Sequence, residues 1–97
     1  MSQAANVSVK NGRWQYGKHI AWRKVAEEAV ILDTDTAVYY SLDEVGTRIW
    51  ELIGKGETVQ EIVRIIAEEY DGSEEQIRRD IEELIGKFQK EKVVEPA

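Results

Sequence analysis

The sequence predicts a small α+β domain in which three strands precede three helices. Two short segments rich in strand-forming residues, 29–33 and 37–42, flank a polar turn. Three amphipathic stretches with helix-capping residues follow them. The chain has 97 residues, which suits one hydrophobic core. We therefore expect a two-layer domain, because packing three helices on one sheet buries the apolar face of every element.

The predicted strands are short and close together in the sequence, so we expect an antiparallel meander. They cover residues 20–25, 29–33 and 37–42. In the third strand, period-two alternation places Val38, Tyr40 and Leu42 on one face and Tyr39 on the other.

The N-terminal part predicts less regular structure. Residues 1–12 are expected to form a flexible terminus. Segments 7–9 and 14–16, joined by Asn11-Gly12, match a minor hairpin, because Asn-Gly favours a type I′ turn. The domain itself is expected over residues 13–97.

The first predicted helix begins after Asp43, whose carboxylate accepts the free amides of a first turn. It ends at Gly54-Lys55-Gly56, since glycine tolerates the left-handed backbone past a helix end. The second and third helices each begin with a capping box, Thr58 with Glu61 and Ser73 with Gln76. Two short capped helices joined by a glycine turn, then a third helix, match a small winged helix-turn-helix. The strand hairpin is its wing.

Composition limits the classes of function. The net charge is −6, whereas nucleic-acid binders usually carry a basic face. The second predicted helix is acidic because it carries Glu61, Glu68 and Glu69. The only basic doublet on a predicted helix is Arg78-Arg79. An acidic winged-helix regulator of DNA therefore remains only the alternative hypothesis.

The cysteine content and the lengths of the apolar runs indicate the cellular compartment of the protein. The chain has no cysteine, which excludes disulfides and thiolate metal sites. It has no apolar run of the roughly 18–20 residues that cross a bilayer. We expect a cytoplasmic protein that binds neither nucleic acid nor membranes.

The sequence contains no pattern typical of an enzyme. His19 is the only histidine, so any catalytic triad would have to use it. Adjacent carboxylates fit acid/base pairs or calcium ligands, but several favour surface ion pairs, with the acid four residues before a base. Those pairs are Glu74–Arg78, Glu75–Arg79 and Glu83–Lys87. No catalytic residue, cofactor or metal site is predicted.

The third strand carries the functional prediction. Residues 37–41 contain neither proline nor charge, the usual devices that protect a sheet edge from pairing. Two interpretations stay open: the strand is central or covered, or it is an edge that pairs with an extended peptide.

An ordered set of short motifs resembles the PqqD-like family. The motifs in the strands and first helix are Trp22-Arg23, residues 29–33, Tyr39-Tyr40-x-Leu42, Val45-Gly46, Ile49-Trp50 and Leu52. Those in the later helices are Thr58-Val59, Glu61-Ile62-Val63, Glu68-Glu69-Tyr70, and Arg79-Asp80-Ile81 with Leu84. The resemblance covers residues 22–94.

This resemblance implies a function. The members of the PqqD-like family include the pyrroloquinoline quinone biosynthesis protein D and the leader-recognition proteins of lasso-peptide and radical-SAM peptide pathways. It implies a RiPP (ribosomally made, post-translationally modified peptide) recognition element, a peptide chaperone. Such an element binds the leader of a precursor peptide by strand addition. It presents the precursor to a modifying enzyme such as a radical-SAM enzyme, a cyclase or a leader peptidase.

The resemblance also implies a peptide-binding set between the third strand and the third helix. The set is Val38, Tyr39, Tyr40, Ser41, Ile77, Arg78, Ile81 and Ile85. We expect apolar leader residues to meet a cleft at Tyr39, Ile77 and Ile81, and we expect Arg78 either to meet acidic leader residues or to pair with Glu74. One of the two tyrosines is expected in the groove and the other in the core.

Two positions depart from the family pattern. The turn before the third strand, residues 33–36, carries no glycine, and Asp43 stands where asparagine is usual. Aspartate and asparagine both cap helix N-termini, so this substitution keeps the cap. The chain resembles the wider family more than its quinone-pathway members, so no particular precursor is implied.

Overall fold

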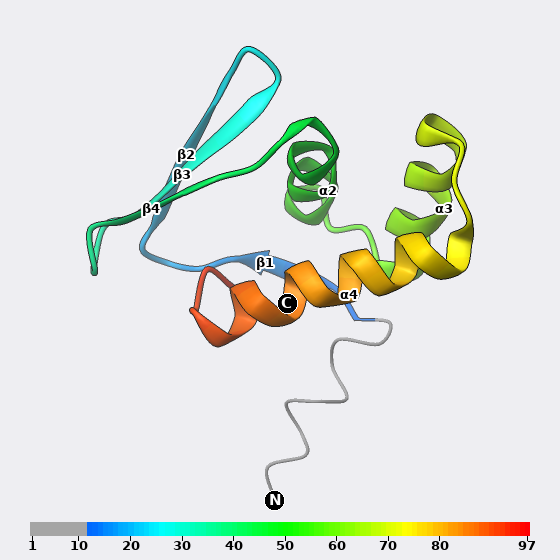
Figure 1. Cartoon of the computed structure of the whole chain (residues 1–97). Coiled ribbons are helices and arrows are strands. Elements are labelled where there is room, and N and C mark those ends of the chain that lie inside the picture. Colours follow the sequence, from blue (N-terminus) through cyan, green and yellow to red (C-terminus); the bar gives the residue numbers. More distant parts are fainter. Residues whose placement is uncertain (1–11) are drawn as a thin grey trace, which may run out of the picture.

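Three antiparallel strands and three helices form the body of the molecule. A computed structural model describes residues 12–97 (Figure 1). The main sheet has the order β2-β3-β4, with β2 at Ile20–Val25, β3 at Glu28–Asp33 and β4 at Val38–Ser41. The helices are α2 (Glu44–Gly54), α3 (Val59–Tyr70) and α4 (Glu74–Lys90). The predicted fold class, an α+β domain with an antiparallel meander before three helices, is confirmed.

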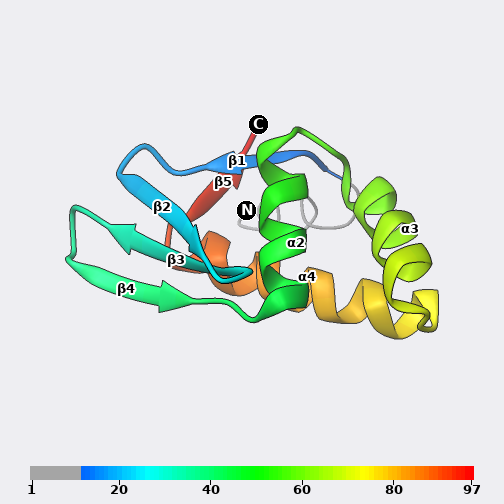
Figure 2. The ribbon, with the colours of Figure 1, turned by 90° about the horizontal axis from the view of Figure 1, so that it is seen from above.

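A second, two-stranded sheet joins the two ends of the described chain. Strand β1 (Trp14–Tyr16) pairs with β5 (Val94–Pro96), so that Tyr16 lies opposite Val94 (Figure 2). Of the predicted minor hairpin, segment 7–9 lies outside the described residues. The predicted second half, residues 14–16, pairs instead with a strand from the opposite end of the chain.

The core lies between the main sheet and the helices. Trp50 of α2 is fully buried at its centre, where its ring stacks on Tyr16 with centroids 4.1 Å apart. Phe88 of α4 packs edge-on against Trp50, with ring centroids 5.7 Å apart. These aromatic contacts hold β1, α2 and α4 together, so the position of α4 relative to the sheet is fixed by large, tightly packed rings.

Helix caps follow the predicted residues with one difference. Asp43 accepts the N–H of Gly46 at 2.8 Å, and Thr58 and Glu61 form a complete capping box. Ser73 accepts the N–H of Gln76, but the Gln76 side chain donates to Asp80 instead of returning to Ser73. The second predicted capping box is therefore only half formed, because an i,i+4 partner competes for the glutamine amide.

Candidate functional site

Strand β4 presents an open edge in the described part of the chain. The Leu42 N–H donates to the Ala29 carbonyl at 3.0 Å, which extends the β3–β4 ladder by one residue. Hydrogen-bonded pairs alternate along an antiparallel ladder, so the main-chain groups of Tyr40 also point toward β3, while the Val38 N–H donates to the Thr36 hydroxyl at 3.3 Å. The main-chain groups of Tyr39 and Ser41 point away from β3. The open edge therefore offers two N–H groups and two carbonyls.

The side chains of β4 divide between two faces. Tyr40 lies on the inner face, where its ring meets Phe88 of α4 edge-on at 5.6 Å. Burial, and then the carboxylates of Glu91 and Asp33, raise the pKa of the Tyr40 phenol. Tyr39 lies on the opposite, outer face and is 67% exposed. The predicted alternation is thus confirmed, with Tyr40 as the residue that packs on the core.

This arrangement corrects one detail of the predicted cleft. Tyr39 was grouped with Ile77 and Ile81, but Tyr39 points away from α4 while those two residues belong to α4. The reason is the two-residue period of a strand, which puts neighbouring tyrosines on opposite faces. Val38, 44% exposed, and Tyr40 are the β4 side chains on the helix side of the sheet.

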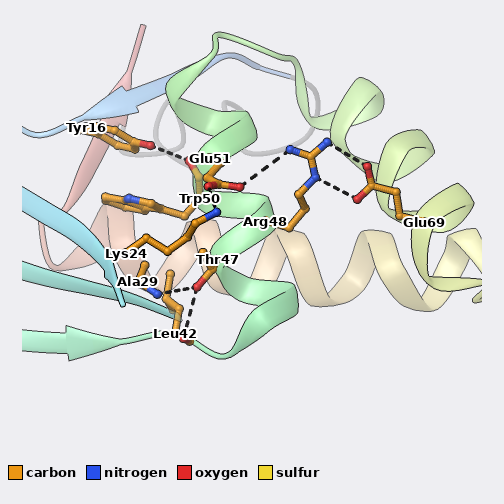
Figure 3. A network of polar contacts seen from close by, with 9 residues as sticks. All are labelled: Tyr16, Lys24, Ala29, Leu42, Thr47, Arg48, Trp50, Glu51 and Glu69. Carbon is orange, nitrogen blue, oxygen red and sulfur yellow. Dashed lines mark hydrogen bonds and ion pairs between the residues drawn. The ribbon is translucent and has the colours of Figure 1, made fainter. Parts of the chain in front are cut away.

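The hydroxyl of Thr47 fastens the end of β4 to the rest of the sheet (Figure 3). It accepts the Ala29 N–H at 2.7 Å and donates to the Leu42 carbonyl at 3.3 Å. Thr47 is buried on α2. A helix side chain therefore completes the ladder where β3 and β4 separate, and this contact fixes the direction in which β4 leaves the sheet.

The α4 residues of the predicted peptide-binding set differ in exposure. Ile77 and Arg78 are partly exposed, whereas Ile81 and Ile85 have no exposed surface. The side chains of Ile81 and Ile85 pack in the hydrophobic core and present no surface to a ligand in this structure. The spacing of four residues correctly placed all these isoleucines on one stripe but could not show how far the core covers that stripe.

Arg78 is held by neighbours other than the predicted one. Its guanidinium donates to the side-chain oxygen of Gln60 on α3 and lies 3.9 Å from the Glu82 carboxylate. Two partners were predicted for Arg78, Glu74 or an acidic leader residue, and the Glu74 pairing is wrong because the guanidinium pairs with Glu82 instead. Glu82 lies one turn after Arg78 on α4. In this orientation the guanidinium also contacts Gln60 on α3. The Glu75–Arg79 pair forms as predicted, at 3.6 Å.

The predicted peptide-binding residues do not all lie at the same level of α4. Tyr40 meets the helix at Phe88, eleven positions after Ile77. At about 1.5 Å of rise per residue, these positions lie roughly 16 Å apart along the helix axis. Figure 2 shows β4 pointing toward the half of the molecule that contains the N-terminal part of α4. The structure therefore brings β4 beside the C-terminal part of α4, and Arg78 lies further along the same direction.

A network of charged residues that local sequence patterns did not reveal braces α2 (Figure 3). Arg48 donates two hydrogen bonds of 2.9 Å to Glu69 of α3 and thereby lowers the pKa of that carboxyl. Lys24 of β2 donates to Glu51 of α2 at 2.8 Å. These partners are 21 and 27 residues apart, beyond the reach of helix-periodicity rules.

Tyr16 completes this network on the side of β1. Its hydroxyl donates to the Trp50 carbonyl at 2.8 Å. Burial, followed by the nearby Glu51 carboxylate, raises the pKa of the Tyr16 phenol to about 12. Tyr16 is therefore protonated at neutral pH and acts as a structural donor.

The described residues show little that resembles a catalytic centre. His19 is largely exposed, and its Nε2 lies 3.9 Å from the Asp35 carboxylate. Within residues 12–97, no three histidine, cysteine or acidic side chains gather as metal ligands. No helix in that range is long and apolar enough to cross a bilayer.

The family model described as Coenzyme PQQ synthesis protein D (PqqD) matches residues 28–94. TbiB1 in complex with the TbiA(beta) leader peptide is 28% identical, with a TM-score of 0.80, and the match covers 84% of this chain and 94% of that chain.

A second solved structure extends this likeness of fold. Lasso peptide synthetase B1 complexed with the leader peptide has a TM-score of 0.80 at 18% identity, and the match covers 87% of this chain and 99% of that chain. At that identity the likeness shows the fold alone. No curated protein matches the chain.

Proposed function

Since this chain belongs to the PqqD family, we propose that it is a leader-binding adaptor of a ribosomal peptide pathway. It pairs the leader of a precursor peptide with the open edge of β4 and presents the precursor to a modifying enzyme. The observation that carries this proposal is the unpaired main chain of Tyr39 and Ser41 on an edge without charge or proline. A structural neighbour, TbiB1, was solved with a leader peptide.

Hydrogen bonds at this edge do not suffice for binding. The two N–H groups and two carbonyls of Tyr39 and Ser41 contribute about 1 kcal/mol each when paired. Association and ordering of a flexible leader cost about 4–15 kcal/mol. Apolar leader side chains must supply the remainder, at about 25 cal/mol per Å² of buried surface.

The inner face of the sheet supplies that apolar contact. A leader strand beside β4 directs alternate side chains toward α4, where Val38 and the Tyr40 ring offer apolar surface. Its other side chains point to the outer face, beside Tyr39. We therefore infer that the leader carries an aliphatic or aromatic residue opposite Tyr40.

Arg78 gives the leader a second contact. About five extended residues at about 3.3 Å each cover the roughly 16 Å between Phe88 and Ile77 along α4. A leader that continues past Ser41 thus reaches Ile77 and Arg78. Arg78 already has Gln60 and Glu82 beside it, so an acidic leader residue must compete with Glu82 for the guanidinium.

We propose a binding role for this chain, without catalysis or a cofactor. The partner enzyme is of the kind that acts on such precursors: a radical-SAM enzyme, a cyclase or a leader peptidase. We infer that the adaptor works in the cytoplasm, where ribosomes make the precursor. The comparisons give no support to the alternative of a DNA-binding regulator.

An NMR titration tests the proposal. The probe is a synthetic leader peptide, chosen from short reading frames that neighbour the gene for this chain. The amide signals of Tyr39 and Ser41 should shift most, followed by those of Ile77 and Arg78, while that of Lys24 on β2 stays in place. An unchanged β4 spectrum with the leader, or salt-sensitive binding of duplex DNA instead, would refute the assignment.

A further inference from the structure

The outer face of the main sheet carries an uncovered apolar hollow. Figure 1 shows the helices on one side of the sheet, so the other side has no covering layer in the described chain. A cavity of about 240 Å³ opens there. Its lining residues are Ala21, Trp22, Arg23, Val30, Leu32 and Tyr39.

Strand register explains the shape of this outer hollow. Ala21, Leu32 and Tyr39 lie side by side across the three strands, and Arg23 lies beside Val30 in the next outward-facing row. Ala21 is small, so the surface is low at the β2 end of this row, beside the longer side chains of Leu32 and Arg23. The result is a depression that fits one protruding apolar side chain.

Arg23 gives the outer hollow a charge that is not neutralised within the described chain. The cations Lys24 and Arg48 form ion pairs with Glu51 and Glu69, whereas no ion pair involves Arg23 among residues 12–97. The hollow itself is lined by no acidic side chain. In a protein with a net charge of −6, an unpaired guanidinium beside tyrosine and aliphatic side chains is the composition of an interface anchor.

We propose that the outer hollow is the docking site for the enzyme that modifies the bound precursor. The enzyme inserts an aliphatic or aromatic side chain into the hollow and pairs a neighbouring carboxylate with Arg23. This inference rests on the proposed function, since it assigns the second partner of the same adaptor. Tyr39 links the two sites, because its main chain belongs to the leader edge and its side chain to the hollow.

Two other occupants fit the outer hollow less well. A leader strand beside β4 lies three strand spacings from β2, about 14 Å from Arg23, so its side chains meet the hollow at Tyr39 but do not reach Arg23. A second copy of the chain would bring two surfaces of charge −6 together and place each Arg23 against a hollow without an acid. An enzyme that supplies both an apolar side chain and a carboxylate satisfies the site.

Charge reversal at Arg23 tests this assignment. The purified modifying enzyme encoded beside the precursor is titrated by calorimetry into the wild-type chain, Arg23→Glu and Ala21→Glu. A matched control, Arg64→Glu, makes the same charge change at an exposed position on α3. We expect both outer-hollow variants to weaken enzyme binding at least tenfold, while Arg64→Glu stays within twofold of wild type.

Leader affinity is measured on the same samples, and it separates this inference from the proposed function. Arg23→Glu should bind the leader within twofold of wild type. Equal enzyme binding by Arg23→Glu and Arg64→Glu would overturn the docking site and leave leader recognition intact. No leader binding by any chain would instead overturn the proposed function. Concentration-dependent dimers in sedimentation that Arg23→Glu abolishes would also overturn the inference, by assigning the outer hollow to a second copy.

Discussion

The two edges of the main sheet, β2 and β4, differ in how they meet solvent. On β4, the main-chain groups of Tyr39 and Ser41 point away from β3. The same alternation on β2 directs the main-chain groups of Trp22 and Lys24 away from β3. On β2, however, Lys24 forms an ion pair with Glu51, and the Trp22 ring packs edge-on against Tyr16 and Trp50. Charged and packed side chains protect an edge from pairing. One sheet therefore has a protected edge and an available one, and the difference lies in side chains.

Proline at each edge gives the largest expected contrast. Ser41→Pro removes an outward N–H and places a ring where a leader strand would lie, without removing a bond to β3. Leader affinity should fall about thirtyfold, equivalent to about 2 kcal/mol. Lys24→Pro makes the same change on β2 and should bind the leader within twofold of Lys24→Ala, which corrects for the lost ion pair. Calorimetry with the synthetic leader measures all three, and equal losses at both edges would remove the distinction.

The two tyrosines of β4 test which face supports the edge. Tyr40→Ala removes a half-buried ring from Phe88 and should lower the free energy of unfolding by about 2 kcal/mol, less than a fully buried aromatic. Tyr39→Ala removes an exposed ring and should change it by less than about 0.5 kcal/mol. Urea unfolding followed by circular dichroism measures both. A reversed order would mean that the register of β4 has been assigned to the wrong faces.

Thr47 tests how firmly the available edge is held. Thr47→Val keeps the side-chain volume but leaves the Ala29 N–H without its acceptor, which should cost about 1.5 kcal/mol of stability. Hydrogen exchange at Leu42 should also become faster, because the same hydroxyl donates to the Leu42 carbonyl. Thr34→Val is the control, since the Thr34 hydroxyl makes one exposed bond to the His19 carbonyl. Equal behaviour of the two variants would show that Thr47 does not hold β4.

The sequence predicts local structure better than it predicts the site. Strand alternation, helix stripes and caps depend on residues a few positions apart, and these predictions hold at β4, Asp43 and Thr58. The pairing of β1 with β5 joins Trp14 to Pro96, and no local pattern contains that information. For the site, the sequence signal behind the proposed binding edge is the absence of charge and proline from residues 37–41.

Burial of the α4 stripe is what the sequence could not resolve. Ile77 and Ile81 are the same residue type on the same helical face, yet only Ile77 keeps exposed surface. The difference depends on which side chains of other elements cover each position. The outer hollow was missed for a related reason, since it requires three strands in register before Ala21 lies beside longer neighbours.

The smallest expected effect concerns Glu69, whose ion pair braces helices away from either edge. Its hydrogen bond with Arg48 lowers the pKa of the folded carboxyl below its ordinary value of 4.5. The pair therefore stabilises the fold at pH values above 4.5, and that contribution is lost as pH falls through the lower, folded pKa. Because the pair is partly exposed and screened by solvent, Glu69→Gln should cost only about 0.5 kcal/mol at pH 7.

Acid and salt titrations of unfolding distinguish this pair from the edges. Glu69→Gln should lose less stability than wild type between pH 5 and pH 3, with the difference at pH 7 shrinking in about 1 M salt. Glu68→Gln, the exposed neighbour, serves as the control. Leader affinity should stay within twofold of wild type in both variants, because Glu69 contacts α2 and not β4. A larger loss of leader binding in Glu69→Gln alone would mean that availability of the β4 edge depends on the packing of α2 against α3.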